Sequence, residues 1–371
     1  MKLFVLLGAF IISQYVYGQE YYLLVGTYDS PKSEGIYVYR FNAANGETKE
    51  ISHIKTSNPS YLSISTDEKF VYAVNENGKN GNGGEVTAFS FDKKIGALSF
   101  INRQLSGGDH PCYIEIDKTG KWVFTGNYSS GTLSAFSIKK DSGLEPSDTI
   151  IRHNGKGINE QRQNGPHVHC TVISPDNKWL LVPDLGIDKT MIYGFDAITG
   201  KLTTGKQPFI ASEPGAGPRH FVFHPTKKLG YLIEELSGTV VAHKYKNGRY
   251  KRIQRVSTLA EGESSFAGSA DIHISPDGKF LYASNRSNIN NIVIYSLNKK
   301  GKLTLIGNQP TLGNTPRHFN FDPTGNYLLA CNQNSNEIVI FKRNIKTGLL
   351  SDSGKRIQVG KPVCIKWINP D

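Results

Sequence analysis

Short runs in which apolar and polar residues alternate recur along the whole chain, and each run favours a β-strand. The runs form pairs: a first strand, a tight turn, and a second strand that ends in Asn, Asp or Glu. Six copies of this pair are present, at Pro59–Glu76, Pro111–Tyr128, Val168–Leu185, Pro218–Glu235, Ser269–Arg286 and Pro316–Gln333. A third and a fourth alternating run follow each pair. A period near 50 residues with four strands per period is typical of a β-propeller.

The two ends of the chain complete a seventh copy. Pro362–Ile368 matches a first strand, Tyr21–Tyr28 a second strand and Gly35–Phe41 a third. We therefore expect an all-β, seven-bladed β-propeller of four-stranded blades, in one domain that spans residues 19–371. Blade seven would be closed by the N- and C-terminal segments, which hides two sheet edges that would otherwise invite aggregation.

Residues 1–18 have the pattern of a secretory signal peptide. Lys2 precedes an apolar run that ends at Ile12, and Val16-Tyr17-Gly18 stands at the expected cleavage position. The run is too short for a comfortable transmembrane helix, although an uncleaved anchor is the alternative. We expect an exported protein, periplasmic or extracellular, with no membrane span after cleavage.

Charge and cysteine content narrow the function only slightly. The formal net charge is +11, but the chain has no long Lys/Arg block, so we expect no nucleic-acid partner and a mild preference for small anionic molecules. Cys112, Cys170, Cys331 and Cys364 fall in predicted strands, where buried thiols are common. Disulfides are the alternative in an oxidising compartment.

Alignment of the copies reveals one shared polar position. Nine residues after the central turn residue, every copy has an amide or a carboxylate: Asn75, Asn127, Asp184, Glu234, Asn285 and Asn332. A polar side chain in every copy predicts a scaffold role, hydrogen-bonded to the backbone where the second strand gives way to its loop.

The positions beside this scaffold residue differ between copies and form the candidate site. In an up-and-down blade, first-strand starts and second-strand ends share one rim around the channel. The residues that should meet there are His169, Arg219, Glu235, Arg286 and Arg317. Three inward guanidinium groups repel one another unless an anion compensates, and we expect Glu235 to answer only one. This surplus predicts an anionic ligand; solvation of a water-filled channel is the alternative.

Other features of this rim have simpler explanations. His220 and His318 directly follow arginines, so strand alternation should turn them into blade packing. His167 and His169 lie two residues apart and could share a face, but no acidic or cysteine set accompanies them, and we expect no metal. The polar loops 77–84 and 152–165 should crown the same rim, as plain connections or as part of the site. No cofactor-binding motif is present, so no cofactor is expected.

Four motifs carry a family resemblance. They are Gly-Pro-His-Val-His-Cys at 165–170, Gly-Pro-Arg-His-Phe at 217–221, Ser-Pro-Asp-Gly-Lys-Phe-Leu-Tyr-Ala-Ser-Asn-Arg at 275–286 and Thr-Pro-Arg-His-Phe at 315–319. Together they resemble the seven-bladed lactonase family, which includes propeller-type 6-phosphogluconolactonases and carboxy-muconate lactonizing enzymes. The resemblance implies a catalytic set of His169, Arg219, Glu235 and Arg286. Glu234 and His318 stand where many relatives have Asn, and we expect a carboxylate at 234 to raise the pKa of Glu235.

The resemblance implies a lactonase that hydrolyses a small anionic or sugar lactone. The arginines would hold the substrate's anion, Glu235 or His169 would activate water, and an arginine or a protonated His169 would stabilise the oxyanion. Further substrate contacts are expected from Arg317, Glu76, Gln333 and His167. A carboxy-muconate-type lactonizing enzyme and a non-enzymatic propeller that binds a partner or a glycan are the alternatives. We expect a monomer.

Overall fold

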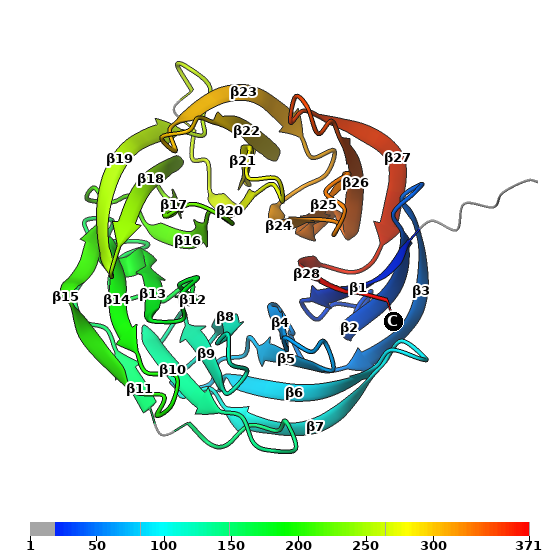
Figure 1. Ribbon diagram of the computed structural model, residues 1–371, viewed down its shortest axis with the longest axis horizontal. Helices are drawn as coiled ribbons and strands as arrows, with labels where there is room; N and C mark the ends of the chain where they lie inside the picture. The colour runs from blue at the N-terminus through cyan, green and yellow to red at the C-terminus, as the bar shows by residue number, and fades with distance from the viewer. Residues whose placement is uncertain (1–18, 82, 148, 264, 371) are drawn as a thin grey trace, which may run out of the picture.

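The computed structural model describes residues 19–81, 83–147, 149–263 and 265–370, so the predicted signal peptide lies outside the described residues. Its strands form seven four-stranded antiparallel sheets that surround a central axis like the blades of a propeller (Figure 1). The prediction of an all-β, seven-bladed β-propeller is confirmed.

Blades one to six each use four consecutive strands, ordered from the centre outward. Blade one contains β4 (Leu62–Ile64), β5 (Phe70–Asn75), β6 (Glu85–Asp92) and β7 (Ala97–Leu105). Blade two contains β8 (Pro111–Ile116), β9 (Trp122–Asn127), β10 (Thr132–Ser137) and β11 (Thr149–Arg152). Blade three contains β12 (Val172–Ile173), β13 (Trp179–Asp184), β14 (Lys189–Phe195) and β15 (Leu202–Ala211). Blade four contains β16 (Pro218–Phe223), β17 (Leu229–Glu234), β18 (Thr239–Lys246) and β19 (Arg249–Ser257). Blade five contains β20 (Ser269–Ile274), β21 (Phe280–Asn285), β22 (Asn291–Leu297) and β23 (Leu303–Pro310). Blade six contains β24 (Pro316–Phe321), β25 (Tyr327–Asn332), β26 (Glu337–Arg343) and β27 (Leu350–Gln358).

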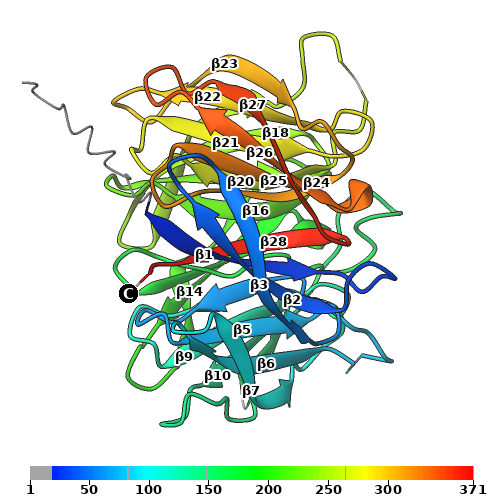
Figure 2. The same ribbon diagram turned by 90° about the vertical axis from the view of Figure 1, so that its right-hand side faces the viewer.

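Blade seven joins the two ends of the chain, as predicted. Its order is β28 (Pro362–Ile368), β1 (Glu20–Thr27), β2 (Gly35–Asn42) and β3 (Glu47–Lys55), so the last strand of the chain is the innermost (Figures 1 and 2). Val25 of β1 pairs with Ile365 on one side and with Tyr37 on the other. The ring is therefore closed by backbone hydrogen bonds between the chain termini.

The hydrophobic core lies between neighbouring blades. The middle strands are buried on both faces, and β5 is buried at every position except its first. Leu24 and Val38 of blade seven belong to the same apolar cluster as Tyr72 and Val86 of blade one. Burial of these facing surfaces holds adjacent blades together.

In five of the six copies the polar residue that ends the second strand ties its blade to the segment leading into it, whereas Glu234 accepts hydrogen bonds from side chains of its own blade, against the predicted backbone role. Asn75, Asn127, Asn285 and Asn332 donate Nδ2–H bonds to the carbonyl oxygens of Ser57, Ser106, Thr258 and Thr311, at 2.5, 3.0, 3.1 and 2.9 Å. Asp184 accepts from the backbone N–H groups of His167 and Gly186 at 2.7 and 3.0 Å. The predicted scaffold role is confirmed for these copies.

Blade three departs from the expected pattern. Its inner strand covers only Val172–Ile173, although a strand from Val168 was expected. The N–H of His169 donates to the carbonyl of Pro183 at 3.0 Å, but Pro183 has no N–H with which to return the bond. The ladder breaks there, Val168 pairs with Asp184 as an isolated bridge, and Cys170 lies outside a strand.

The four cysteines are all buried and free. Burial raises the pKa of Cys364 to about 11, so this thiol stays protonated at neutral pH. Within the described ranges, no helix has both the length and the apolar character needed to cross a bilayer.

Candidate active site

Arg219 and Arg317 each occupy a β-bulge at the start of an inner strand. The pairing of β16 with β17 shifts between Pro218 and His220, and that of β24 with β25 shifts between Pro316 and His318. A bulge inserts one extra residue and re-aims its side chain. In these two blades, therefore, simple strand alternation does not decide which side chains face the centre.

Glu235 lies directly after β17 and contacts three guanidinium groups. Its Oε2 is 2.9 Å from Arg286 Nη2 and 3.0 Å from Arg219 Nε, and its Oε1 accepts a hydrogen bond from Arg162 Nη2 at 2.7 Å. The Arg219 contact is ionic, because its Nε–H is not aligned for a hydrogen bond. The expectation that Glu235 answers only one arginine was wrong.

Arg162 was not predicted as a site residue. It belongs to the 152–165 loop. Its Nη2 donates hydrogen bonds to the Tyr128 hydroxyl at 3.3 Å and to Glu235 Oε1 at 2.7 Å. The predicted position of this loop was the only signal in the sequence. A loop outside the repeat has no counterpart in the other copies, so the alignment that exposed Glu235 could not expose Arg162.

The protonation of Glu235 is the reverse of what the sequence suggested. Burial alone raises the pKa of this carboxyl group, but Arg286, Arg219 and Arg162 outweigh burial and lower it to about 2. The expected effect of Glu234 was wrong, because that side chain is engaged elsewhere and accepts a hydrogen bond from Arg255 Nε at 3.1 Å. Glu235 is thus a fixed negative charge and a weak base.

A second ion group lies beside the first. Arg317 Nη2 is 3.9 Å from Glu76 Oε1, the Tyr28 hydroxyl donates to Glu76 Oε2 at 2.7 Å, and the Arg317 guanidinium lies 5.4 Å from the Tyr28 ring centroid. The members of the two groups are Arg162, Arg219, Arg286, Arg317, Glu235 and Glu76. Four guanidinium groups against two carboxylates leave a surplus of two positive charges.

His169 lies buried beside this surplus. Its ring is 5.4 Å from that of Tyr128 and 5.3 Å from that of His220. Burial, followed by the charge of Arg219, lowers the pKa of His169 well below its usual 6.5. The imidazole is therefore neutral at pH 7, which leaves the arginines, rather than a protonated His169, as the candidates for stabilising an oxyanion. His167 stacks on Tyr128 with 4.5 Å between ring centroids, at the edge of the same group.

A second layer of side chains lies directly below the two ion groups and fills the centre of the ring. The rings of Tyr61 and Tyr113 stack with centroids 4.1 Å apart, Tyr61 lies 5.7 Å from His318, and Tyr113 lies 5.2 Å from His220. These residues come from blades one, two, four and six, so both histidines face the central axis. The expectation that they turn into blade packing was wrong, because the bulges interrupt the alternation.

Asp271 of β20 is the centre of this deeper layer, and the sequence analysis missed it. Its oxygens accept from His220 Nδ1 at 2.9 Å, Ile272 N at 3.0 Å, His318 Nδ1 at 2.8 Å, His273 Nε2 at 2.9 Å and Phe319 N at 3.2 Å. Burial raises the pKa of Asp271, but His273 and His318 outweigh burial and hold it well below the usual value. Asp271, His273 and His318 lie close enough to be metal ligands, although their mutual hydrogen bonds already account for the grouping.

The deeper layer also holds the site above it. Because His220 Nδ1 donates to Asp271, its Nε2 is free to accept from Arg219 Nη1, at 3.2 Å. Arg219 Nη1 donates to the Ala270 carbonyl as well. A chain of contacts thus runs from Asp271 through His220 and Arg219 to Glu235.

Gln333 is the one predicted site residue that no contact joins to these groups within the described chain. It opens the 3-10 turn η2 (Gln333–Ser335), the counterpart of η1 (Leu185–Ile187) in blade three. Its backbone N–H donates to the Thr315 carbonyl at 3.0 Å. The other seven predicted residues fall in the two ion groups or beside them.

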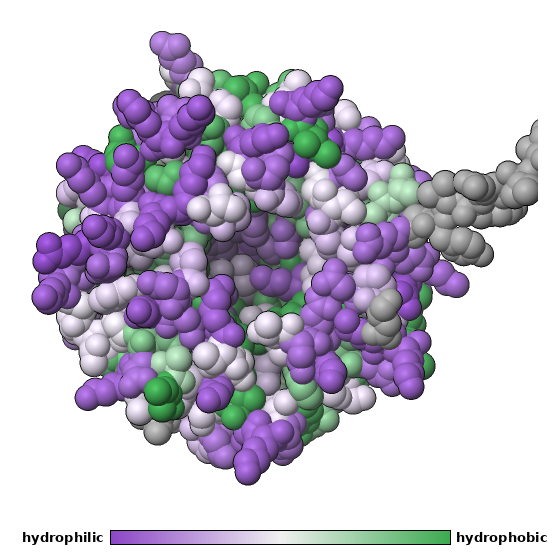
Figure 3. All heavy atoms as spheres, in the orientation of Figure 1, coloured by the Kyte–Doolittle hydropathy of each residue, from purple (hydrophilic) through white to green (hydrophobic). Residues whose placement is uncertain are grey.

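At the opposite end of the ring from the two ion groups, on the face where the C-terminus lies, hydrophilic residues gather around a hollow at the centre (Figures 2 and 3).

Residues 22–367 match the model of a family described as "Lactonase, 7-bladed beta-propeller". The chain belongs to this lactonase family. The resemblance drawn from the four motifs is therefore confirmed.

Lactonases of this family from other organisms match most of the chain. A 6-phosphogluconolactonase of Formosa agariphila is 41% identical over 88% of this chain and 94% of its own length. A 6-phosphogluconolactonase of Bacillus subtilis is 35% identical over 93% of this chain and 97% of its own. The structure of a periplasmic gluconolactonase, PpgL, from Pseudomonas aeruginosa is 33% identical, with a TM-score of 0.90 and coverage of 95% of this chain and 100% of that one.

Proposed function

We propose that the protein hydrolyses a sugar lactone that carries an anionic group, at the two ion groups around Glu235 and Glu76. The observation that carries this proposal is the surplus of guanidinium groups over carboxylates beside the neutral His169. This buried surplus is offset only in part by the ionised Asp271 in the layer below, and it favours an anionic ligand. The relatives named 6-phosphogluconolactonase support the same substrate class.

In this proposal the arginines share two tasks. Arg317 lies next to Glu76, beside the Glu235 group, and it binds the phosphate or carboxylate of the substrate. Arg286 and Arg219, which share Oε2 of Glu235, stabilise the oxyanion that develops on the lactone carbonyl. Glu235 keeps these guanidinium groups oriented and acts as a positioning residue.

His169 is the general base in this mechanism. Its neutral imidazole takes a proton from water as the water oxygen attacks the carbonyl carbon. The tetrahedral intermediate then collapses, the ester C–O bond breaks, and the proton passes to the departing ring oxygen, which leaves as a hydroxyl. Glu235 is disfavoured as the base because three arginines lower its pKa to about 2.

Export of the protein forms part of the same proposal. The pattern of residues 1–18 supports a signal peptide, and one relative is named as a periplasmic gluconolactonase. An exported, monomeric enzyme would meet unphosphorylated sugar lactones more often than phosphorylated ones. The phosphate-bearing and the plain substrate therefore have to be compared directly.

A lactone panel tests the proposal. Hydrolysis of 6-phosphogluconolactone and of gluconolactone above the spontaneous rate is expected for the wild type, with a loss of about 10²–10⁴-fold in His169→Gln. With His169 as base, kcat/KM stays constant through neutral pH and falls only on acidification well below pH 6.5, because burial and Arg219 lower the pKa of this imidazole, whereas a Glu235 base would keep kcat/KM high to about pH 2. Spontaneous rates for both lactones would contradict the proposal, and turnover of a carboxy-muconate instead would favour a lactonizing enzyme.

A further inference from the structure

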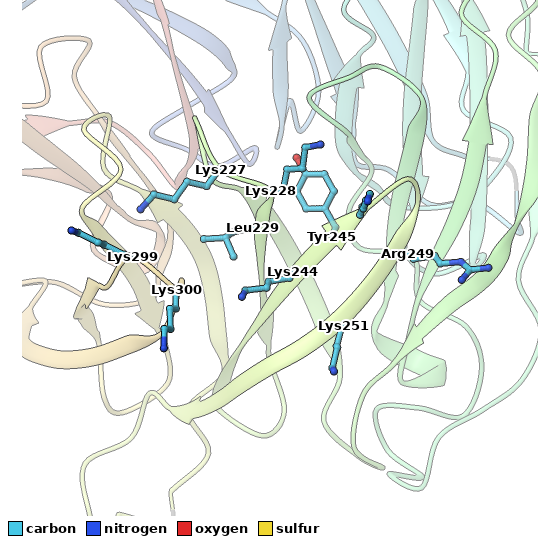
Figure 4. A pocket seen from close by; sticks show the side chains of 10 residues that line it. Lys227, Lys228, Leu229, Lys244, Tyr245, Arg249, Lys251, Lys299 and Lys300 are labelled. Atoms are coloured by element: carbon cyan, nitrogen blue, oxygen red, sulfur yellow. The ribbon is translucent and has the colours of Figure 1, made fainter.

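We propose that the face opposite the candidate active site carries a second binding site, a basic groove that takes a strand of an anionic polysaccharide. The groove lies between blades four and five and has a volume of about 550 Å³ (Figure 4). Eight of the ten residues that line it are lysine or arginine, and none is acidic. The proposal does not depend on the proposed lactonase function.

The cations come from three neighbouring turns. The turn between β16 and β17 contributes Lys227 and Lys228, and the turn between β22 and β23 contributes Lys299 and Lys300. The hairpin of β18 and β19 contributes Lys244, Lys246, Arg249 and Lys251. All eight side chains are exposed, and none forms an ion pair within the part of the chain that the structure describes. No ion pair therefore neutralises the positive charge of the groove within the described residues.

The hairpin places like charges directly opposite each other. Lys244 pairs with Lys251 across the two strands, and Lys246 pairs with Arg249. Cross-strand pairs of like charge are destabilising. An anion bound along the hairpin would remove this repulsion. Because the like-charge pairs do not stabilise the fold, they favour a ligand-binding role for the hairpin.

The shape and surroundings of the groove favour a polysaccharide strand over a membrane. Leu229 is the one aliphatic side chain that lines the groove, and it is buried, so no exposed aliphatic anchor is available to enter a bilayer. A second hollow shares Lys246 and Arg249 with the groove and adds Lys206 and Trp179. Basic groups that continue from one hollow into the next suit an extended chain of acidic sugars, whose carboxylates would pair with the cations.

The groove and the candidate active site lie at opposite ends of the same strands. Lys228 directly precedes β17 and Glu235 directly follows it, and a six-residue strand is about 20 Å long. Changes in the groove should therefore leave lactone hydrolysis unchanged.

Binding of polygalacturonate to the full chain tests the proposal. The variant Lys244→Gln/Lys246→Gln/Arg249→Gln/Lys251→Gln should bind it about tenfold more weakly, because several exposed ion pairs of modest strength are lost together. The control variant Lys49→Gln/Lys121→Gln/Lys140→Gln/Lys342→Gln removes as many exposed charges elsewhere and should bind within about twofold of the wild type. Added salt should weaken wild-type binding more steeply than binding by the groove variant.

Three further measurements keep the test decisive. The groove variant should unfold at the wild-type temperature or above it, because the like-charge pairs are gone, so weaker binding cannot be attributed to misfolding. Neutral dextran of the same length should not bind. Equal affinity of the groove and control variants would overturn the proposal, and so would tighter binding to phosphatidylglycerol vesicles or duplex DNA than to polygalacturonate at the same salt concentration.

Discussion

Glu235 and Asp271 are buried carboxylates in adjacent layers of the same channel, and both are held ionised, but by different partners. Glu235 is surrounded by three arginines, one of which, Arg162, has a side chain that is 36% exposed. Asp271 is surrounded by imidazole and backbone N–H donors that are themselves buried or half-buried. The first arrangement leaves positive charge available to a ligand, whereas in the second both carboxylate oxygens are engaged by five donors. A lowered pKa alone therefore does not distinguish a carboxylate in a binding site from one with a structural role. The groups that contact the carboxylate make that distinction.

The largest effect is expected from Glu235→Ala. Three guanidinium groups would lose their shared counter-ion, and breaking a buried ion group costs about 3–5 kcal/mol of unfolding free energy. Lactone hydrolysis should fall with it, because Arg286 and Arg219 lose their orientation. Urea unfolding and kinetics measure the two losses. Glu85→Ala, which breaks the half-exposed pair with Arg103, is the control and should cost at most about 1 kcal/mol. Equal losses of unfolding free energy in the two variants would show that the Glu235 ion group stabilises the fold no more than an exposed ion pair does.

Asp271→Asn should separate stability from catalysis. The amide keeps one acceptor oxygen but turns an NH2 group toward N–H donors, and unsatisfied buried donors cost about 1–3 kcal/mol each. We expect about 2–4 kcal/mol of lost unfolding free energy, with only about a tenfold loss of kcat through misplacement of Arg219, a loss of about 1.4 kcal/mol in activation free energy. Asp271→Glu should restore part of kcat if the role is positional. A loss of activity without a loss of stability would make Asp271 part of the reacting site instead.

Much of the fold followed from the sequence because its signal is periodic. The repeated strand pair specified the blades, and the matching ends of the chain specified how blade seven closes. The same alignment exposed His169, Arg219, Glu235 and Arg286, which the structure brings together, because these residues differ from their counterparts in the other copies.

The errors arose where the backbone leaves the repeat. The bulges at Arg219 and Arg317 redirected the histidines that follow them, and a bulge leaves no mark in a pattern of alternating residues. Arg162 comes from a loop that has no counterpart in the other blades. Asp271 stands in an inner strand where the alignment offered no reason to look for a carboxylate that gathers three histidines.

Arg317→Gln tests whether the two ion groups contact different parts of the substrate. If Arg317 binds the substrate's anion, KM for 6-phosphogluconolactone should rise about tenfold or more, because a hydrogen bond to a charged group contributes about 1.5–3 kcal/mol. The kcat should change little, since the oxyanion is held by Arg286 and Arg219. Steady-state kinetics with gluconolactone provides the comparison, and its KM should stay near the wild-type value. Equal increases for both lactones would show that Arg317 holds the sugar ring or the site itself rather than a phosphate.

The smallest effect is expected in acid. The pKa of Glu235 lies at about 2 in the folded protein, below its ordinary value of 4.5, so its ionised form stabilises the fold above about pH 4.5. That stability is lost progressively as the pH falls from about 4.5 toward 2, because the unfolded chain takes up a proton that the folded chain does not. Glu235→Gln takes up no proton there, so between about pH 5 and pH 4 the unfolding free energy of the wild type should fall by about 0.7 kcal/mol more than that of the variant. Asp271 is present in both proteins and cancels in this difference. Urea unfolding at the two pH values measures it, and parallel pH dependences would mean that the three arginines do not hold Glu235 ionised.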